Sequence, residues 1–181
     1  GSAWKFAQED ISTDLIRGKA WSHLPPKEQG AHCLEEVDPA FAARAQPGDF
    51  IVGGRNFGCG SSREAAVYVL ADAGYRCVLA PSFGDIFANN CGKNGLLPVV
   101  LPTAACDAIR RQLRDKVGAQ IAVDLHAQTV TDVAGTVYRF DIHPVRRKCL
   151  LEGLDDVERT RQYQGAIEAF EAAYKQERSW L

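Results

Sequence analysis

The stretch DFIVGGRNFGCGSSREAAVYVLADAGYRCVLA, residues 49–80, decides the fold class of this chain. It predicts a short buried strand over 49–52, a glycine-rich turn, a helix over 62–73 that Gly74 ends, and a second buried strand over 76–80. A helix over 83–91, a strand over 96–101 and an amphipathic helix over 103–116 continue the pattern. Strands and helices that alternate at this pace are typical of right-handed crossovers onto a mostly parallel sheet. We therefore expect an α/β fold.

The segments on either side have a different character. Residues 9–48 are polar and interrupted by prolines, so we expect a loop-rich region with a short helix around 27–36. Downstream, the stretches 120–125, 129–133 and 136–142 predict a β-meander. A helical pattern then runs from 155 to 175, with Ile167, Phe170 and Tyr174 at spacings of three and four. We expect one domain over 4–181, with a core at 49–150 and a C-terminal helix at 155–177. Residues 1–3 are taken as a terminus in which Gly1-Ser2 resembles a cloning scar.

The composition excludes two classes of partner. The 181 residues are 46% hydrophobic and 24% charged, and 21 Lys and Arg against 23 Asp and Glu give a formal charge of -2. A nucleic-acid or membrane-surface binder normally shows a basic excess, and no stretch approaches the roughly 18 to 20 apolar residues of a membrane span. The N-terminus lacks the regions of a signal peptide. We expect a cytoplasmic domain with no nucleic-acid or membrane partner.

The cysteines argue against a metal centre held by this chain. They form no CxxC pair, and their spacing matches no zinc or ferredoxin pattern. Apolar or small residues surround most of them, which is typical of buried, reduced thiols. The six positions are 33, 59, 77, 91, 106 and 149.

Residues 54–64, GRNFGCGSSRE, follow a predicted strand and open a predicted helix. Glycines allow the backbone to approach a ligand closely, and the free amides at a helix start suit an anion such as a carboxylate or phosphate. Arg63 adds a fork that can hold a carboxylate bidentately. The pattern is neither a P-loop nor a dinucleotide fingerprint, because Cys59-Gly60 follows Gly58 and an arginine stands where the last glycine is needed.

Ser61 has two alternative roles. In a purely structural capping box, Ser61 accepts the amide of Glu64 and the Glu64 side chain reaches back. In a functional role, Ser61 lies beside Arg63, and this cation together with the helix start stabilises the alkoxide, so that serine acts as a proton acceptor. The residues alone leave both alternatives open.

Five blocks of the chain, in this order, resemble the small-subunit family of 3-isopropylmalate dehydratase, the swivelling domain of the aconitase superfamily. The resemblance spans roughly residues 4–175 and implies a swivelling β/β/α domain with a mostly parallel sheet, flanking helices and a C-terminal helix. The blocks are 10–14 (DISTD), 54–64 (GRNFGCGSSRE), 80–90 (APSFGDIFANN), 94–98 (NGLLP) and 151–156 (LEGLDD).

The resemblance also implies an activity. Family members are hydro-lyases that dehydrate and rehydrate a hydroxy-dicarboxylic acid, and they act only with a large subunit. That subunit holds a [4Fe-4S] cluster through three of its own cysteines, so the cluster is not bound by this chain. We expect leucine biosynthesis as the pathway and the face around residues 55–64 as the partner surface. Two alternatives remain open: a related hydratase for maleate, citraconate or a substituted malate, and a non-catalytic carboxylate-binding module.

The resemblance assigns site residues by position. Ser61 matches the serine that takes and returns the proton on the carbon next to a carboxylate. Asp14 matches an acidic residue that helps orient the acid–base groups, and Ser62 and Arg63 match binders of the substrate carboxylate. The chemistry agrees, because a dicarboxylate needs cationic and N–H donors and its carbon acid needs a charge-stabilised base.

One segment departs from the family pattern. Members usually carry an aromatic-Leu-Arg run after the aspartate, within the substrate-loop segment that we place at 15–48. Here Trp21 stands at the aromatic position, while Ser22 and His23 replace the Leu-Arg pair. We therefore expect Trp21 near the substrate and the distal carboxylate on Lys19, Arg17 or His23. This departure motivates the alternative of a smaller diacid.

Overall fold

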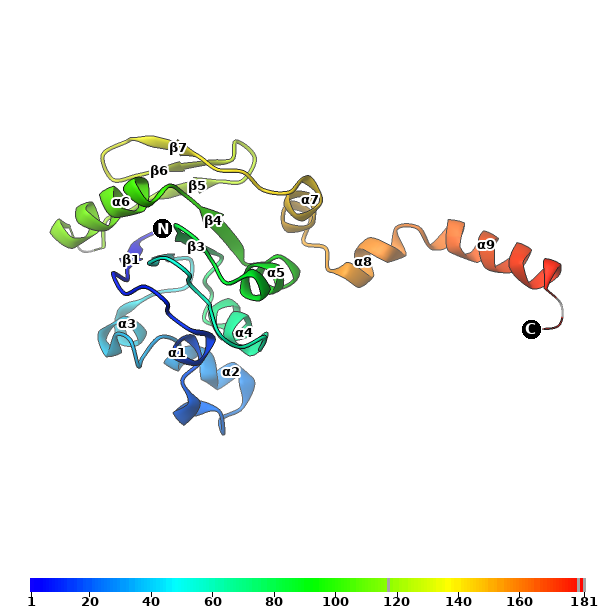
Figure 1. The fold of residues 1–181 in the computed structure, drawn as a ribbon, viewed down its shortest axis with the longest axis horizontal. Helices are drawn as coiled ribbons and strands as arrows, with labels where there is room; N and C mark the ends of the chain where they lie inside the picture. The colour runs from blue at the N-terminus through cyan, green and yellow to red at the C-terminus, as the bar shows by residue number, and fades with distance from the viewer. Residues whose placement is uncertain (117, 179, 181) are drawn as a thin grey trace.

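The computed structural model describes residues 1–116, 118–178 and 180, and its body is built on a four-stranded parallel sheet (Figure 1). The strands lie in the order in which they occur in the chain, and each pairs with the next in parallel. They are β1 (Ala3–Lys5), β2 (Phe50–Val52), β3 (Cys77–Ala80) and β4 (Leu97–Val100). The predicted α/β fold with a mostly parallel sheet is confirmed.

Two hydrophobic cores lie on opposite faces of this sheet. Alternate residues of a strand point to opposite faces, so Ile51 enters one core and Val52 the other. The crossover helices α4 (Ala65–Asp72) and α5 (Asp85–Lys93) pack on the first core, and α6 (Thr103–Asp115) packs on the second. Helices therefore cover both faces, and the candidate motif at 54–64 lies between β2 and α4.

The predicted meander is present and covers the α6 side of the sheet (Figure 1). Its strands form a separate antiparallel sheet of β5 (Ala122–Asp124), β6 (Thr129–Thr131) and β7 (Val137–Arg139). The carboxylate of Asp132 lies buried in the turn after β6. It accepts hydrogen bonds from Gln112 Nε2 at 2.8 Å and from the amides of Ala134 and Thr136 at 2.9 and 2.8 Å. The turn is thereby tied to α6.

The N-terminal segment is more regular than the loop-rich region that the sequence predicts. The helix expected around 27–36 is α2, which runs Pro26–Gln29 and continues into a 3₁₀ turn at 30–32. Strand β1 is not predicted by the sequence, because three residues are too few to show an alternating pattern. The pairing of β1 with β2 continues to Ser2, whose carbonyl accepts the Phe50 amide at 2.7 Å. The other helices of this segment are α1 (Thr13–Ile16) and α3 (Pro39–Arg44).

The C-terminal part contains three helices: α7 (Pro144–Glu152), α8 (Asp156–Arg161) and α9 (Gln164–Glu177). Helix α7 is not predicted, since its apolar residues show little helical periodicity. The single helix expected over 155–177 is broken at residues 162–163 into α8 and α9. These two helices project from the body (Figure 1), and neither contains a buried residue. Within the part of the chain that the structure describes, no helix is long and apolar enough to cross a bilayer.

All six cysteines are free, and four of them are buried, which confirms the predicted reduced, mostly buried thiols. Burial raises the pKa of the Cys33 thiol to about 12 and that of Cys106 to about 11. These thiols stay protonated at neutral pH, whereas a metal needs the thiolate. Among the described residues, no three His, Cys, Asp or Glu side chains gather as a metal-binding group.

Ending the chain after Gly153 should leave the body stable, because α8 and α9 bury no side chain. We expect the free energy of unfolding to change by less than about 1 kcal/mol, measured by urea titration of the isolated chain. Ending it after Ile142 is the matched control and should cost about 1–3 kcal/mol. That change removes Arg147, which donates to the carbonyls of Leu125 and His126. A large loss of stability in the chain that ends after Gly153 would show that α8 and α9 support the fold.

Candidate active site

Two segments far apart in the sequence lie side by side at the candidate site. Residues 10–14 run parallel to residues 55–59, and Ser12 forms a parallel bridge with Cys59. Three backbone hydrogen bonds join them: Asp10 N donates to Arg55 O at 2.9 Å, Gly58 N to Ile11 O at 2.7 Å, and Thr13 N to Cys59 O at 2.9 Å. We call this contact the parallel seam. It brings two blocks of the family resemblance into one site.

The glycines of the motif are required by the shape of the loop. Gly58 has φ +75° and Gly60 has φ +95°, a region that favours glycine. A Cβ at Gly58 would also overlap the ring of Phe87 in α5. The loop therefore passes directly over α5. A side chain at Gly58 would push the loop away from α5 and disturb the parallel seam, in which Gly58 takes part.

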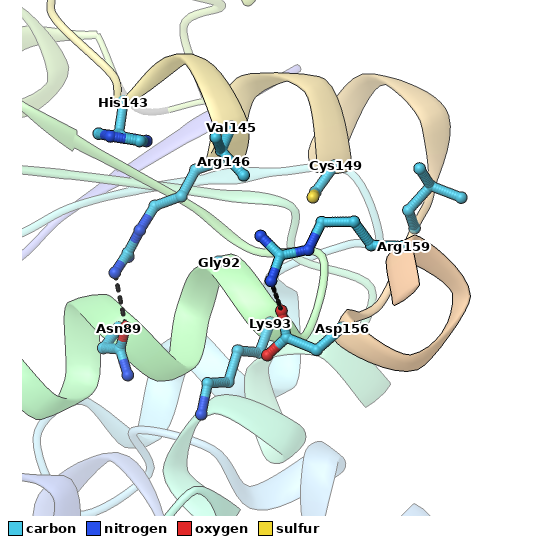
Figure 2. Close-up of a pocket in the computed structure, with 10 residues that line it drawn as sticks. Asn89, Gly92, Lys93, His143, Val145, Arg146, Cys149, Asp156 and Arg159 are labelled. Carbon is cyan, nitrogen blue, oxygen red and sulfur yellow. Dashed lines mark hydrogen bonds and ion pairs between the residues drawn. The ribbon is translucent and has the colours of Figure 1, made fainter. Parts of the chain in front are cut away.

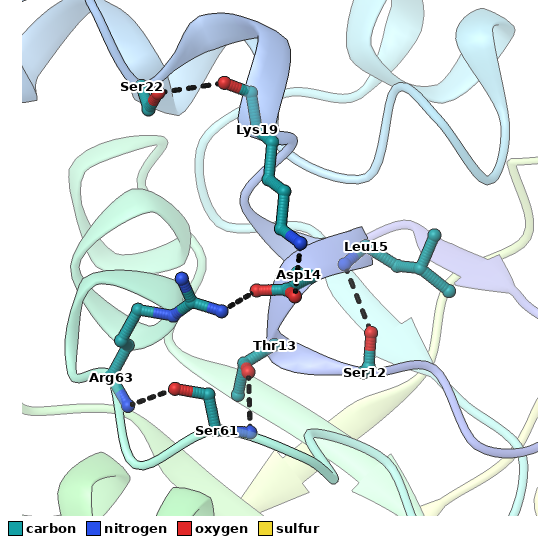
Figure 3. Close-up of polar contacts among 8 residues, drawn as sticks. All are labelled: Ser12, Thr13, Asp14, Leu15, Lys19, Ser22, Ser61 and Arg63. Carbon is teal, nitrogen blue, oxygen red and sulfur yellow. Dashed lines mark hydrogen bonds and ion pairs between the residues drawn. The ribbon is translucent and has the colours of Figure 1, made fainter.

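Ser61 does not form the capping box that the sequence allows. Helix α4 begins at Ala65, three residues later than predicted, and its N-cap residue Glu64 makes no capping hydrogen bond. The carboxylate of Glu64 instead accepts from the Tyr68 hydroxyl at 2.9 Å. Ser61 Oγ accepts from the Arg63 amide at 3.3 Å, and the Ser61 amide donates to Thr13 Oγ1 at 3.2 Å (Figure 3). Ser61 therefore lies outside the helix, with its amide bonded to Thr13 and its hydroxyl to the Arg63 amide.

Asp14 is held between two cations. Its carboxylate pairs with the Arg63 guanidinium on one side and with Lys19 Nζ at 3.2 Å on the other (Figure 3). The hydrogen bond from Lys19 and the charge of Arg63 lower the pKa of Asp14 below its ordinary value. Asp14 is therefore a carboxylate at neutral pH, and it fixes the position of the Arg63 side chain next to Ser61.

These side chains border a small pocket of about 110 Å³. Three cations, Arg17, Lys19 and Arg63, face it with a single carboxylate, that of Asp14. An excess of cations over carboxylates in a small pocket suits a ligand with negative charge. The lining residues are Thr13, Asp14, Arg17, Lys19, Ser22, Arg63 and Ala66.

The structure separates the substrate-loop residues that the sequence groups together. Arg17 and Ser22 line the pocket, and Arg17 Nε donates to Gln29 Oε1 at 2.5 Å. Trp21 instead stacks on the His32 ring, with centroids 3.9 Å apart. His23 is exposed and lies outside the pocket lining, so substrate contacts of Trp21 and His23 stay predictions. Arg17 follows Asp14 by three residues, a spacing that places two side chains on the same side of a helical turn. This spacing is the sequence signal that favours Arg17 as a residue of the pocket.

Ser62 occupies an exposed position between Ser61 and Arg63. Its carbonyl accepts from Asn90 Nδ2 at 3.5 Å, which ties the loop to α5. No hydrogen bond of its hydroxyl is present among the described residues. Its predicted contact with a substrate carboxylate stays a prediction.

A larger hollow lies elsewhere, between α5 and the junction of α7 with α8 (Figure 2). Its volume is about 300 Å³, and none of the predicted site residues lines it. Arg146 donates to Asn89 Oδ1 at 2.5 Å, and Arg159 pairs with Asp156 at 3.4 Å. Because none of the predicted site residues lines this hollow, we place the site in the smaller pocket, which Asp14, Lys19 and Arg63 line.

Comparison with known proteins decides the family. The family model of the aconitase C-terminal domain matches residues 7–104, and a second model, LeuD_N, matches residues 107–144. A 3-isopropylmalate dehydratase small subunit from Ruegeria sp. (strain TM1040) is 47% identical over 184 residues, covering 95% of this chain and 92% of that protein. This chain belongs to the 3-isopropylmalate dehydratase small-subunit family. Those names favour the predicted dehydratase small subunit over both alternatives.

Other members of the small-subunit family agree. The proteins from Roseobacter denitrificans and Teredinibacter turnerae are 48% and 43% identical, and the match covers 74% and 87% of this chain. The chain spans 66% of the length of the first and 73% of the second. A crystal structure of 3-isopropylmalate dehydratase (leuD) from Methanocaldococcus jannaschii is 29% identical with a TM-score of 0.75, covering 94% of this chain and 97% of that one. The predicted swivelling-domain fold is confirmed.

The ion pairs of Asp14 should make a pH-dependent contribution to stability. Because the folded chain lowers the pKa of Asp14, this contribution is complete above the ordinary value of 3.8 and is lost as the pH falls through the lowered value. Asp14→Asn removes it. The difference in unfolding free energy between wild type and Asp14→Asn should therefore shrink as the pH falls from about 5 to about 2, as measured by urea titration.

Glu9→Gln is the matched control for Asp14→Asn. It removes an exposed carboxylate that pairs with Arg55 at 3.1 Å, and exposed pairs of this kind contribute little to stability. A difference for Asp14→Asn that stays constant with pH would contradict the ionised pair.

Proposed function

We propose that this chain is the small subunit of an iron–sulfur hydro-lyase that dehydrates and rehydrates 3-isopropylmalate, acting in the cytoplasm in leucine biosynthesis. The observation that carries the proposal is the placement of Ser61 next to Arg63, which lines one cationic pocket together with Asp14, in a chain of this family. The relatives' names state a dehydratase and a small subunit, and a small subunit implies a larger partner.

In this proposal Ser61 takes and returns the proton on the carbon next to a substrate carboxylate. The Ser61 hydroxyl already accepts the Arg63 amide at 3.3 Å, so its oxygen lies beside a backbone donor. This donor stabilises negative charge on that oxygen as the proton is returned to substrate. Cysteines of the large subunit would hold the cluster, which would supply Lewis-acid chemistry for the departure of the hydroxyl.

The cations around the pocket would bind the two substrate carboxylates. Arg63 offers a planar fork that matches a carboxylate, and Asp14 occupies one side of this fork in the free chain. Lys19 lies 3.2 Å from the other oxygen of Asp14. As substrate engages Arg63, Lys19 retains Asp14 and limits the repulsion between two carboxylates. Ser62, with Lys19, Trp21 and His23, completes the proposed set of substrate contacts.

Water has to be excluded from the site, and this requires a partner subunit. Arg63 and Lys19 have 48% and 73% of their side-chain surface exposed, whereas a base and a carbanion-like centre need water excluded. We propose that the large subunit covers the face around residues 55–64 and closes the pocket. The isolated chain would then be folded, colourless and inactive.

The test is anaerobic hydration by this chain co-expressed with a large subunit, followed as loss of alkene absorbance. We expect isopropylmaleate to be preferred over maleate and citraconate. Ser61→Ala should lower kcat by about 1,000-fold or more, and Ser2→Ala, far from the pocket, should leave it unchanged. Preference for a smaller diacid would contradict 3-isopropylmalate as the substrate. Near-wild-type turnover by Ser61→Ala would contradict the mechanism.

Arg63→Lys keeps the charge but loses the bidentate fork. We expect the assembled enzyme to lose about 10- to 100-fold in kcat/KM for isopropylmaleate, mainly through a higher KM. Arg139→Lys, on exposed β7, is the matched control. Unchanged kinetics of Arg63→Lys would remove Arg63 from the carboxylate site.

A further inference from the structure

We propose that Thr13 is a positioning residue, and that its hydroxyl holds Ser61 in the catalytic arrangement against a competing helix cap. The inference rests on the proposed role of Ser61. Thr13 does not contact the reacting atoms in this account, because its side chain meets the amide of Ser61 and not the Ser61 hydroxyl.

Thr13 contacts the serine loop through both its side chain and its backbone. Thr13 Oγ1 accepts the Ser61 amide at 3.2 Å, and the Thr13 amide donates to the Cys59 carbonyl at 2.9 Å (Figure 3). Only 2% of its surface is exposed, whereas Asp14, Lys19 and Arg63 are all partly exposed. A buried hydroxyl with fixed partners on one loop is suited to setting geometry.

The loop has a second conformation that its own sequence favours. Ser61-x-x-Glu64 is a capping-box sequence, in which Ser61 Oγ would accept the Glu64 amide. Adopting it would extend α4 backwards by one turn from Ala65 and use the Ser61 oxygen as a structural acceptor. A capped helix start contributes stability, so this alternative competes with the observed arrangement.

Thr13 decides this competition by giving the Ser61 amide an acceptor outside the helix. While Thr13 holds the Ser61 amide, Ser61 Oγ accepts the Arg63 amide at 3.3 Å, and the Glu64 carboxylate accepts the Tyr68 hydroxyl. Without the acceptor, the Ser61 amide is released to the Glu64 carboxylate, and the loop can form the capping box. The Ser61 oxygen would then accept the Glu64 amide in place of the Arg63 amide.

The experiment removes the acceptor and keeps the shape. Thr13→Val is nearly isosteric, Thr13→Ser restores the hydroxyl, and Thr129→Val in strand β6 is the matched control. In the assembled enzyme with saturating large subunit, we expect Thr13→Val to lower kcat about 10- to 100-fold with KM within about 3-fold. Thr13→Ser should recover kcat to within about 3-fold of wild type. If Thr13→Val does not fold, Thr13→Ala removes the same acceptor.

A second measurement does not depend on activity. Amide hydrogen exchange in the isolated full chain should be about 10-fold slower or more at Glu64 in Thr13→Val, because Ser61 Oγ then accepts the Glu64 amide, and faster at Arg63, whose amide loses that acceptor. Wild-type kcat in Thr13→Val, equal losses in Thr13→Ser, or unchanged exchange at Arg63 and Glu64 would overturn the inference. If the wild-type assembly hydrates no diacid, the proposed function fails, and the exchange result still decides the Thr13 contact.

Discussion

The parallel seam between residues 10–14 and 55–59 is the contact on which the rest of the site depends. Its three backbone hydrogen bonds join a segment that precedes the substrate loop to the loop that carries Ser61. Backbone donors and acceptors cannot be left unpaired in a closed site, so the two segments fix each other's path. The seam places Thr13 under Ser61 and Asp14 beside Arg63. Both proposed functions of the loop, proton transfer and carboxylate binding, follow from that placement.

The charged side chains beside the parallel seam suit an exchange of the carboxylate that is paired with Arg63. Asp14 occupies Arg63 in the free chain and is itself shared with Lys19. An exposed ion pair is weak in water, so a substrate carboxylate can replace Asp14 at Arg63 at little cost before a partner covers the pocket. The small subunit thus presents its cations in position and leaves the exclusion of water to a partner.

Much of the fold could be predicted from local patterns, and the departures have local causes. The strand–helix alternation over 49–116 and the meander gave the right elements, because burial and turn residues act over short stretches. Three-residue β1 was missed since it has no room for a pattern, and α7 because its apolar residues follow no helical period. The two C-terminal helices were predicted as one, although residues 162–163 interrupt them.

The candidate site was predictable only in part. The resemblance supplied Ser61, Arg63 and Asp14, and the structure brings these three together. Of the two alternatives for Ser61, the capping box is not observed, and the Ser61 amide is instead bonded to Thr13, a residue distant in sequence. Trp21 was placed by its position in the family motif, but its ring stacks on His32. Such pairings depend on tertiary structure and leave no periodic signal.

The most direct test of this account is whether the parallel seam exists in the chain without its partner. Amide hydrogen exchange of the isolated protein, resolved by residue, reports this at Gly58 and Thr13, whose amides donate across the seam. We predict that both exchange slowly, with protection close to that of amides in the central strand β3. Rapid exchange at both positions would show that the seam forms only on assembly, and would contradict a site built in advance by this chain.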